Sequence, residues 1–236
     1  MPLSEPHEKT AKQKWNAEIE SLKDQALAKF HRSFDSKMLK ELQSVANYFV
    51  IGIDSKAAPK SKDKRIEFVL VYDLQSGKPL HWTGKAYPQP QQRGCLIKMP
   101  IETHFLQERI GGKKIAVFGC HDLSIFNPRH QRHFSPFDDE RNGKRKVDTP
   151  TGKIKCPFID ATLDFNPDIV LQLAHTEGTW AAKWTRFNAW LQRKKSKKLQ
   201  HFASGLKENL KGKKQYSLSG TQRGDVMNFV NGKWIR

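Results

Sequence analysis

The stretch KKIAVFGCHDLSIFNPR, residues 113–129, decides how the rest of the chain is interpreted. A short apolar run ends at Gly119 and Cys120, and polar residues follow at once. Continuous apolar runs are typical of strands that are covered on both faces, and a side chain at the end of such a strand is held rigidly. The stretch therefore predicts a buried strand that carries a thiol at its end.

Similar apolar runs lie on both sides of this stretch. NYFVIGID (residues 47–54) and IEFVLVYDL (66–74) predict two core strands that are separated by a lysine-rich loop. SGKP then predicts a turn, and LHWTGKAYP (80–88) the returning strand of a hairpin. FNPDIVLQLAH (165–175) predicts a further buried strand. A last hairpin is expected where Asn231 and Gly232 separate two β-like arms.

Helical spacing predicts three amphipathic segments between and before these strands. Residues 9–28 form the first and residues 38–46 the second. The third follows His175, where apolar residues recur on one helical stripe: Trp180, Trp184, Phe187, Trp190 and Leu191. The polar segment at about 127–157 is too long for a compact connection and is expected to be an insertion, either a lid or a mobile excursion. Together these patterns predict a single α/β domain over residues 1–236.

The composition limits the kinds of protein that this chain can be. Lys and Arg number 42 against 24 Asp and Glu, a formal net charge of +18 that would attract an anionic partner. The three cysteines are an odd and sparse set, and no leader-like segment opens the sequence, so we expect a cytoplasmic protein. No apolar run approaches the roughly 20 residues that span a bilayer, so no membrane contact is expected.

Three blocks of the sequence resemble the nitrilase, or carbon-nitrogen hydrolase, superfamily. They are EFVLVYDLQSGKPLHWTGKAYP (67–88), KKIAVFGCHDLSIFNPR (113–129) and NPDIVLQLAHTEGTWAAKW (166–184). The resemblance implies an α-β-β-α sandwich. The family has another strand and helix ahead of its glutamate, so the resemblance implies that this chain lacks them. An incomplete frame, a split protein and a remodelled relative are all open at this point.

The resemblance also implies a set of site residues. Cys120 would be the nucleophile, and Lys85 the cation that stabilises the oxyanion. The general base would be Glu5, with Glu8 as the alternative, at the end of an early strand. A glutamate can take the proton of the thiol, while an ammonium group favours negative charge on sulfur and then on oxygen.

Other polar residues allow different interpretations. We expect His121, Trp180 and His175 to border the substrate, although His121 could simply form a hydrogen bond at a strand end. A zinc site at Cys120, Cys156 and the nearby histidines is disfavoured, because their spacing is loose and arginines lie between the histidines. We therefore expect neither a metal nor a cofactor.

The leading hypothesis is a hydrolase of a small amide, carbamoyl compound or nitrile, which acts through Cys120, Lys85 and Glu5. A homo-oligomer is expected by analogy with the family. The alternative is a catalytically inactive relative that binds nucleic acid or a protein through its basic surface. The basic runs RNGKRK (141–146) and RKKSKK (193–198) suggest this alternative, but no recognised nucleic-acid-binding motif accompanies them.

Overall fold

The computed structural model describes residues 5–54, 66–86, 96–119, 122, 150–174, 181–194, 199–207, 225–230 and 233–235. It describes the backbone alone at residues 5–14, 150–155, 174, 181–186, 203–207, 225–230 and 233–235. The chain divides into two compact units, residues 1–49 with 71–80 and residues 50–70 with 81–236. The single domain that the sequence predicts stays a prediction.

The first unit has its aromatic centre at Phe30, on the long helix α1 (Glu5–Ser33). Ile19, Ala26 and Phe30 are buried, and their spacing places them on one face of the helix. The Phe30 ring lies 4.8 Å from the ring of Tyr72, measured between centroids. The helix predicted at residues 9–28 is thus confirmed, and it extends further at both ends.

A short helix, α2 (Ser36–Gln43), follows α1. It begins at Asp35, whose side chain accepts a hydrogen bond of 2.8 Å from the backbone N–H of Met38. Such an N-cap satisfies one of the N–H groups that a helix leaves open at its start. The second predicted helix, at residues 38–46, is therefore confirmed with earlier bounds.

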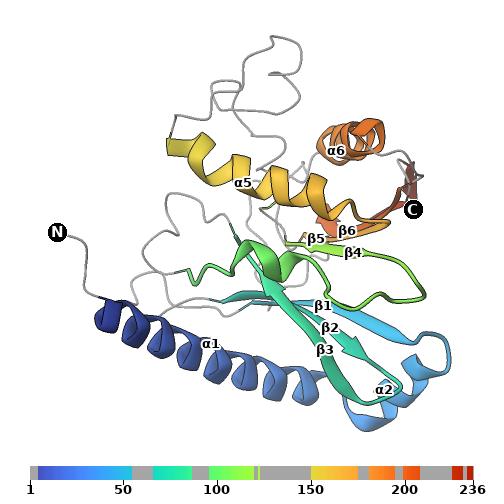
Figure 1. Ribbon diagram of the computed structural model, residues 1–236. Helices are drawn as coiled ribbons and strands as arrows, with labels where there is room; N and C mark the ends of the chain where they lie inside the picture. Colours follow the sequence, from blue (N-terminus) through green and yellow to red (C-terminus); the bar gives the residue numbers. More distant parts are fainter. Residues whose placement is uncertain are drawn as a thin grey trace, which may run out of the picture. The chain divides into compact units, whose positions relative to one another are not determined.

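A three-stranded sheet follows in the order β1-β2-β3 (Figure 1). Its strands are β1 (Tyr48–Asp54), β2 (Glu67–Asp73) and β3 (Lys78–Gly84). Between β2 and β3 the chain turns at Gly77, whose φ of 67° is a conformation that glycine adopts at little cost. These strands confirm the predicted pair of core strands and the returning strand after SGKP.

A second sheet has the order β4-β5-β6-β7-β8. Parallel pairing joins β4 (Ile115–Phe118), β5 (Ile169–Ala174) and β6 (Gln200–Lys207). Antiparallel pairing adds β7 (Asp225–Val230) and β8 (Lys233–Ile235), which confirms a hairpin on either side of Asn231 and Gly232. All four residues of β4 are buried, as the continuous apolar run predicts.

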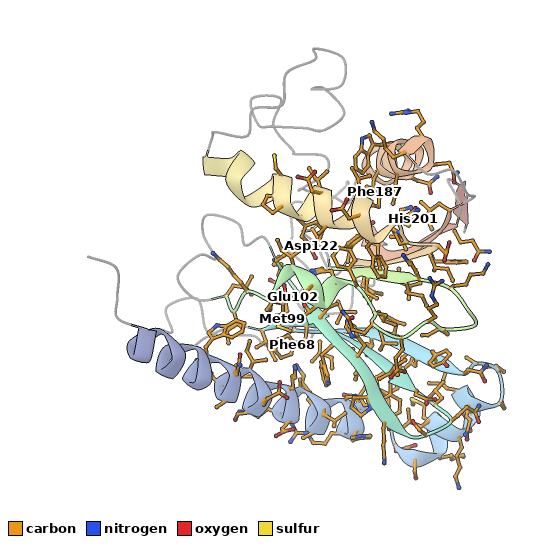
Figure 2. The ribbon with its side chains drawn as sticks, in the orientation of Figure 1. Phe68, Met99, Glu102, Asp122, Phe187 and His201 are labelled. Carbon is orange, nitrogen blue, oxygen red and sulfur yellow. The ribbon has the colours of Figure 1, made fainter. Side chains whose placement is uncertain are left out.

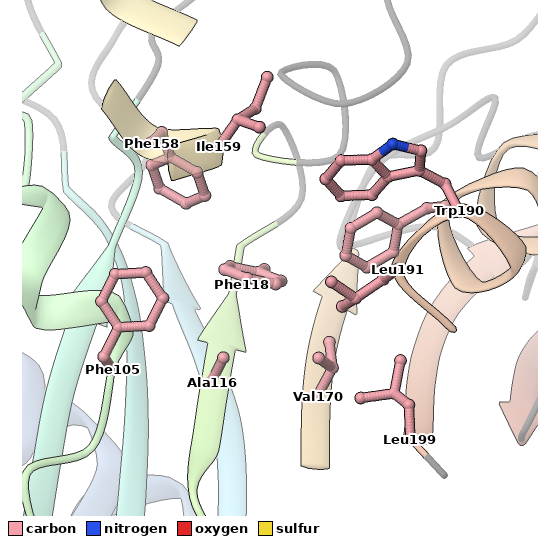
Figure 3. Close-up of a cluster of buried hydrophobic side chains, with 10 residues drawn as sticks. Phe105, Ala116, Phe118, Phe158, Ile159, Val170, Trp190, Leu191 and Leu199 are labelled. Carbon is pink, nitrogen blue, oxygen red and sulfur yellow. The ribbon is translucent and has the colours of Figure 1, made fainter. Parts of the chain in front are cut away.

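Two helices, α5 (Pro150–Phe165) and α6 (Ala181–Lys194), contribute buried side chains to the same core as β4 and β5 (Figure 3). Phe158 of α5 and Phe187 of α6 both lie against the ring of Phe118, at centroid distances of 5.5 and 5.9 Å. Aromatic contacts of this kind supply much of the apolar burial in a core. The predicted α/β class is confirmed.

Helix α5 corrects one boundary that the sequence predicts. Its residues 150–157 fall inside the segment expected to be an insertion at about 127–157. Cys156 is buried there, so this end of the segment belongs to the core. Gly152 and Pro157 weaken the helical pattern in the sequence, because glycine and proline are poor residues for a helix interior. The earlier residues of the segment, up to 149, lie outside the described residues.

Candidate functional site

The lysine that the sequence singles out lies directly after β3, in the second unit. Lys85 follows Gly84, and its side chain is only 1% exposed. Its Nζ forms an ion pair with Oε2 of Glu67, the first residue of β2, whose side chain is 11% exposed. An ammonium group buried this deeply requires a charged partner, because transfer out of water is costly for an isolated charge.

The glycine before Lys85 allows the backbone to come close to its neighbours. A Cβ atom on Gly84 would lie 2.7 Å from the backbone oxygen of Glu67 and 2.8 Å from Cγ of Met99. Neither distance is compatible with a real side chain. Gly84 therefore sets how closely Lys85 approaches the start of β2.

Asp122 is the polar residue that connects this strand end with the end of β4. It is fully buried and lies two residues after Cys120 in the sequence. Its Oδ2 accepts a hydrogen bond of 2.9 Å from the Gly119 N–H, and its Oδ1 accepts one of 3.2 Å from the Ala86 N–H. One carboxylate thus holds the residue that precedes Cys120 and the residue that follows Lys85.

A buried histidine contacts the same carboxylate. His104 ends the short 3-10 helix η2 (Ile101–His104), and its Nε2 lies 3.1 Å from Oδ2 of Asp122. Its Nδ1 faces the backbone oxygens of Pro100 and Ile101 at 3.3 and 3.2 Å. Both ring nitrogens of His104 therefore face oxygen acceptors, Nδ1 two carbonyl oxygens and Nε2 a carboxylate.

The described residues therefore bring two short segments together, residues 84–86 and the pair Gly119 and Asp122. A Cβ atom on Gly119 would lie 3.8 Å from the backbone oxygen of Gly84. The backbone N–H of Asp122 also donates to the oxygen of Gly119, at 3.3 Å. Asp122 is labelled in Figure 2, where it lies near the end of β4. These segments flank the two residues that the sequence predicts to be the nucleophile and its cation.

The other predicted site residues have different outcomes. Cys120, His121, His175 and Trp180 lie outside the described residues. Glu5 is the first residue of α1, which corrects the expectation of a strand end. That expectation came from the order of elements in the family, whereas the polar sequence after Glu5 favours a helix from the start. Glu8, the alternative base, lies in the same helix.

Three polar residues of this site carry no role in the sequence-based prediction. Glu67 gives one signal, since it is a single acidic residue at the start of an otherwise apolar strand. Asp122 gives another, because it follows Cys120 at a fixed spacing of two. His104 gives none, since nothing in the sequence indicates that it would meet Asp122 across the fold.

Elsewhere in this unit, His201 of β6 is fully buried. Burial lowers the pKa of its imidazole to about 3, so the ring is neutral at physiological pH. Its ring lies 5.4 Å from that of Phe187, edge to face. Among the described residues there is no group of three or more His, Cys, Asp or Glu that could hold a metal ion. No helix in that part of the chain is long and apolar enough to cross a membrane.

Comparison with known proteins shows similarity at the level of structure. No protein-family model matches the chain, and no curated protein matches it in sequence. The chain is similar to an amidase from Nesterenkonia sp., with a TM-score of 0.41, 11% identity, and coverage of 72% of this chain and 52% of the amidase. The chain thus spans about half the length of that amidase.

Two further solved structures resemble the chain. One is a carbon-nitrogen hydrolase from Helicobacter pylori G27, with a TM-score of 0.43, 12% identity, and coverage of 87% of this chain and 64% of the hydrolase. The other is a glutamine-dependent NAD+ synthetase from Acinetobacter baumannii, with a TM-score of 0.44, 14% identity, and coverage of 84% and 30%.

Proposed function

We propose that this chain hydrolyses a carbon-nitrogen bond that is not a peptide bond, in a small amide, carbamoyl compound or nitrile, with Cys120 as the nucleophile. The observation that carries the proposal is the joining of residues 84–86 to Gly119 and Asp122 around one buried carboxylate. Cys120 is covalently bonded to Gly119, and Lys85 to Gly84 and Ala86. A thiol and an ammonium group carried by such segments are suited to act on one carbonyl group.

For an amide, the reaction would proceed in two stages. The carboxylate of the general base takes the proton of the Cys120 thiol. The thiolate attacks the carbonyl carbon, and the ammonium group of Lys85 stabilises the oxyanion that forms. The carbon-nitrogen bond then breaks, and the leaving nitrogen takes a proton from a carboxylic acid, which leaves a thioester on Cys120. Water, deprotonated by the same carboxylate, attacks the thioester and releases the acid and the free thiol. His121, His175 and Trp180 are proposed to border the substrate.

Two carboxylates are candidates for the proton transfers. Glu5 is the residue that the sequence resemblance favours, with Glu8 as its alternative. Glu67 is the carboxylate that contacts Lys85. Glu5→Gln and Glu67→Gln, measured side by side for kcat on a set of small amides, would separate them. The true base loses most of its kcat when its carboxylate becomes an amide, because an amide cannot accept the proton.

The proposal is tested by labelling the intact chain with a thiol-directed amide probe and locating the adduct by peptide mass spectrometry. We expect a covalent adduct on Cys120 in the wild type and none at that position in Cys120→Ser. Lys85→Met should slow labelling of Cys120 strongly, since it removes the cation that favours the thiolate. Equal labelling of the wild type and Cys120→Ser would refute the proposal.

The net charge of +18 supports an alternative function. In this alternative the chain is a catalytically inactive relative that binds an anionic partner. The basic run at residues 141–146 and most of the run at 193–198 lie outside the described residues. Retention on an immobilised polyanion, measured against salt concentration, tests this function. Negligible retention that does not vary with salt would exclude it.

A further inference from the structure

We infer that His104 and Asp122 form a positioning couple, which holds residues 84–86 against Gly119 and thereby sets the placement of Cys120 relative to Lys85. The effect on Cys120 rests on the proposed function, but His104 and Asp122 themselves are both described residues. Neither residue is placed in contact with substrate, so both act through the segments that they hold.

The carboxylate of Asp122 has three hydrogen-bonding partners from three parts of the chain. They are the N–H of Gly119, the N–H of Ala86 and Nε2 of His104. Hydrogen bonds to an ionised carboxylate are roughly twice as strong as those between neutral groups. Because Asp122 is fully buried, water does not compete for these contacts. A single side chain therefore fixes two backbone segments that are distant in the sequence.

The orientation of His104 is itself fixed on all sides. Its Nδ1 faces the backbone oxygens of Pro100 and Ile101, which leaves Nε2 as the atom that meets Asp122. The imidazole lies edge to face with the ring of Phe158, at a centroid distance of 4.9 Å, and is stacked at 6.2 Å with that of Phe118. The aromatic core thus holds the imidazole, and the imidazole holds the carboxylate.

Substitutions of His104 can distinguish the contribution of Nδ1 from that of Nε2. In His104→Gln the side-chain amide nitrogen can take the position of Nε2 and still reach Asp122. In His104→Asn the shorter side chain replaces Nδ1 but does not reach the carboxylate. His81→Gln is the matched control, because the Nε2 of His81 lies 2.6 Å from the backbone oxygen of Thr103.

Amide hydrogen exchange, followed by NMR on the intact chain, measures the two backbone donors directly. We expect exchange at Ala86 and Gly119 to be about tenfold faster in Asp122→Asn and His104→Asn. His104→Gln should remain near the wild type, and His81→Gln should leave both amides unchanged. The amide of Leu106, which bonds to the oxygen of Ile115, is the internal reference. Unchanged exchange at Ala86 and Gly119, or equal acceleration at Leu106, would overturn the inference.

The consequence for the thiol is read from iodoacetamide alkylation with peptide-resolved mass spectrometry. In Asp122→Asn and His104→Asn we expect alkylation of Cys120 to slow by about tenfold, because the thiolate loses its placement beside the cation. Cys156 is 3% exposed and serves as the folding control, since general loosening would expose it to the reagent. Faster alkylation of both cysteines, or an unchanged rate at Cys120, would overturn the positioning role.

A different measurement would refute the proposed function without refuting the positioning role. If Cys120 of the wild type reacts no faster than free cysteine, the thiol is not activated and the hydrolase proposal is refuted. Amide exchange at Ala86 and Gly119 would still decide whether the couple joins the two segments.

Discussion

Lys85 and Glu67 form an ion pair across the second unit, between the residue that follows β3 and the first residue of β2. Replacing Glu67 removes the ion-pair partner of a buried ammonium group. We therefore expect Glu67→Gln to lower the free energy of unfolding by about 3–5 kcal/mol. Urea denaturation followed by tryptophan fluorescence would measure the change.

The control for that prediction is an ion pair on the surface of the first unit. Lys23 Nζ lies 2.7 Å from Oε1 of Glu20 on α1, and the Glu20 side chain is largely exposed. Glu20→Gln should cost less than about 1 kcal/mol, because water and salt screen the pair. The double variant Glu67→Gln with Lys85→Met should recover part of the loss, since the buried ammonium group is then removed together with its carboxylate partner. Equal costs for Glu67→Gln and Glu20→Gln would contradict the buried pair.

Gly84 provides a second prediction, since it has no room for a side chain. A Cβ atom there would lie 2.7 Å from a backbone oxygen that belongs to another strand, so Gly84→Ala forces the backbone to shift. We expect a loss of about 1–3 kcal/mol in the free energy of unfolding, as is typical of overpacking. Gly52→Ala in β1 is the matched control, because nothing lies within 4 Å of its Cβ position. Thermal unfolding of both variants should show a lower Tm for Gly84→Ala alone.

Most strands and most helices could be predicted because their signals are local, whereas β6 (Gln200–Lys207) was not predicted. The apolar run that forms β4 and the Asn231-Gly232 signal between β7 and β8 each depend on neighbouring residues only. Helix α5 was missed because Gly152 and Pro157 interrupt its pattern. Phe158 and Ile159 nevertheless bury their side chains in the core, so tertiary packing outweighs the weak local preference.

The candidate site could be predicted only in part, because some of its contacts form between elements that are distant in the sequence. Lys85 was found through its spacing from Cys120 and the family resemblance. The partners of Lys85 and Asp122 were not, since Glu67 and His104 reach these residues only when separate elements come together. A sequence shows which residue types are present, but it does not show which buried charge faces which partner. For Glu5 only the expected element was wrong, because the residue begins a helix and does not end a strand. Its role as the base stays a prediction.

The aromatic core allows a third prediction. Phe118 of β4 is buried between Phe158 and Phe187, so Phe118→Ala should cost about 3–5 kcal/mol. Phe202 of β6 is 38% exposed, and Phe202→Ala should cost clearly less. Urea denaturation of the two variants makes the comparison. Similar losses for both would show that Phe118 is not a central residue of this core.

The last prediction concerns pH and His201. Burial lowers the pKa of the folded imidazole to about 3, whereas in the unfolded chain it titrates near its ordinary value of 6.5. Between these values the unfolded state binds the additional proton, so stability falls as the pH falls. Above pH 6.5 both states are neutral, and His201 then contributes no pH dependence.

As the pH falls from 6.5 toward 3, His201 should therefore contribute a loss of up to about 1.4 kcal/mol per pH unit. His201→Gln removes the titrating group and should flatten this part of the stability profile, whatever its effect at neutral pH. His31→Gln on α1 is a control, because that histidine is exposed. Urea denaturation at a series of pH values would measure both slopes. A slope that is the same in the wild type and in His201→Gln would show that the imidazole does not stay neutral in the folded chain.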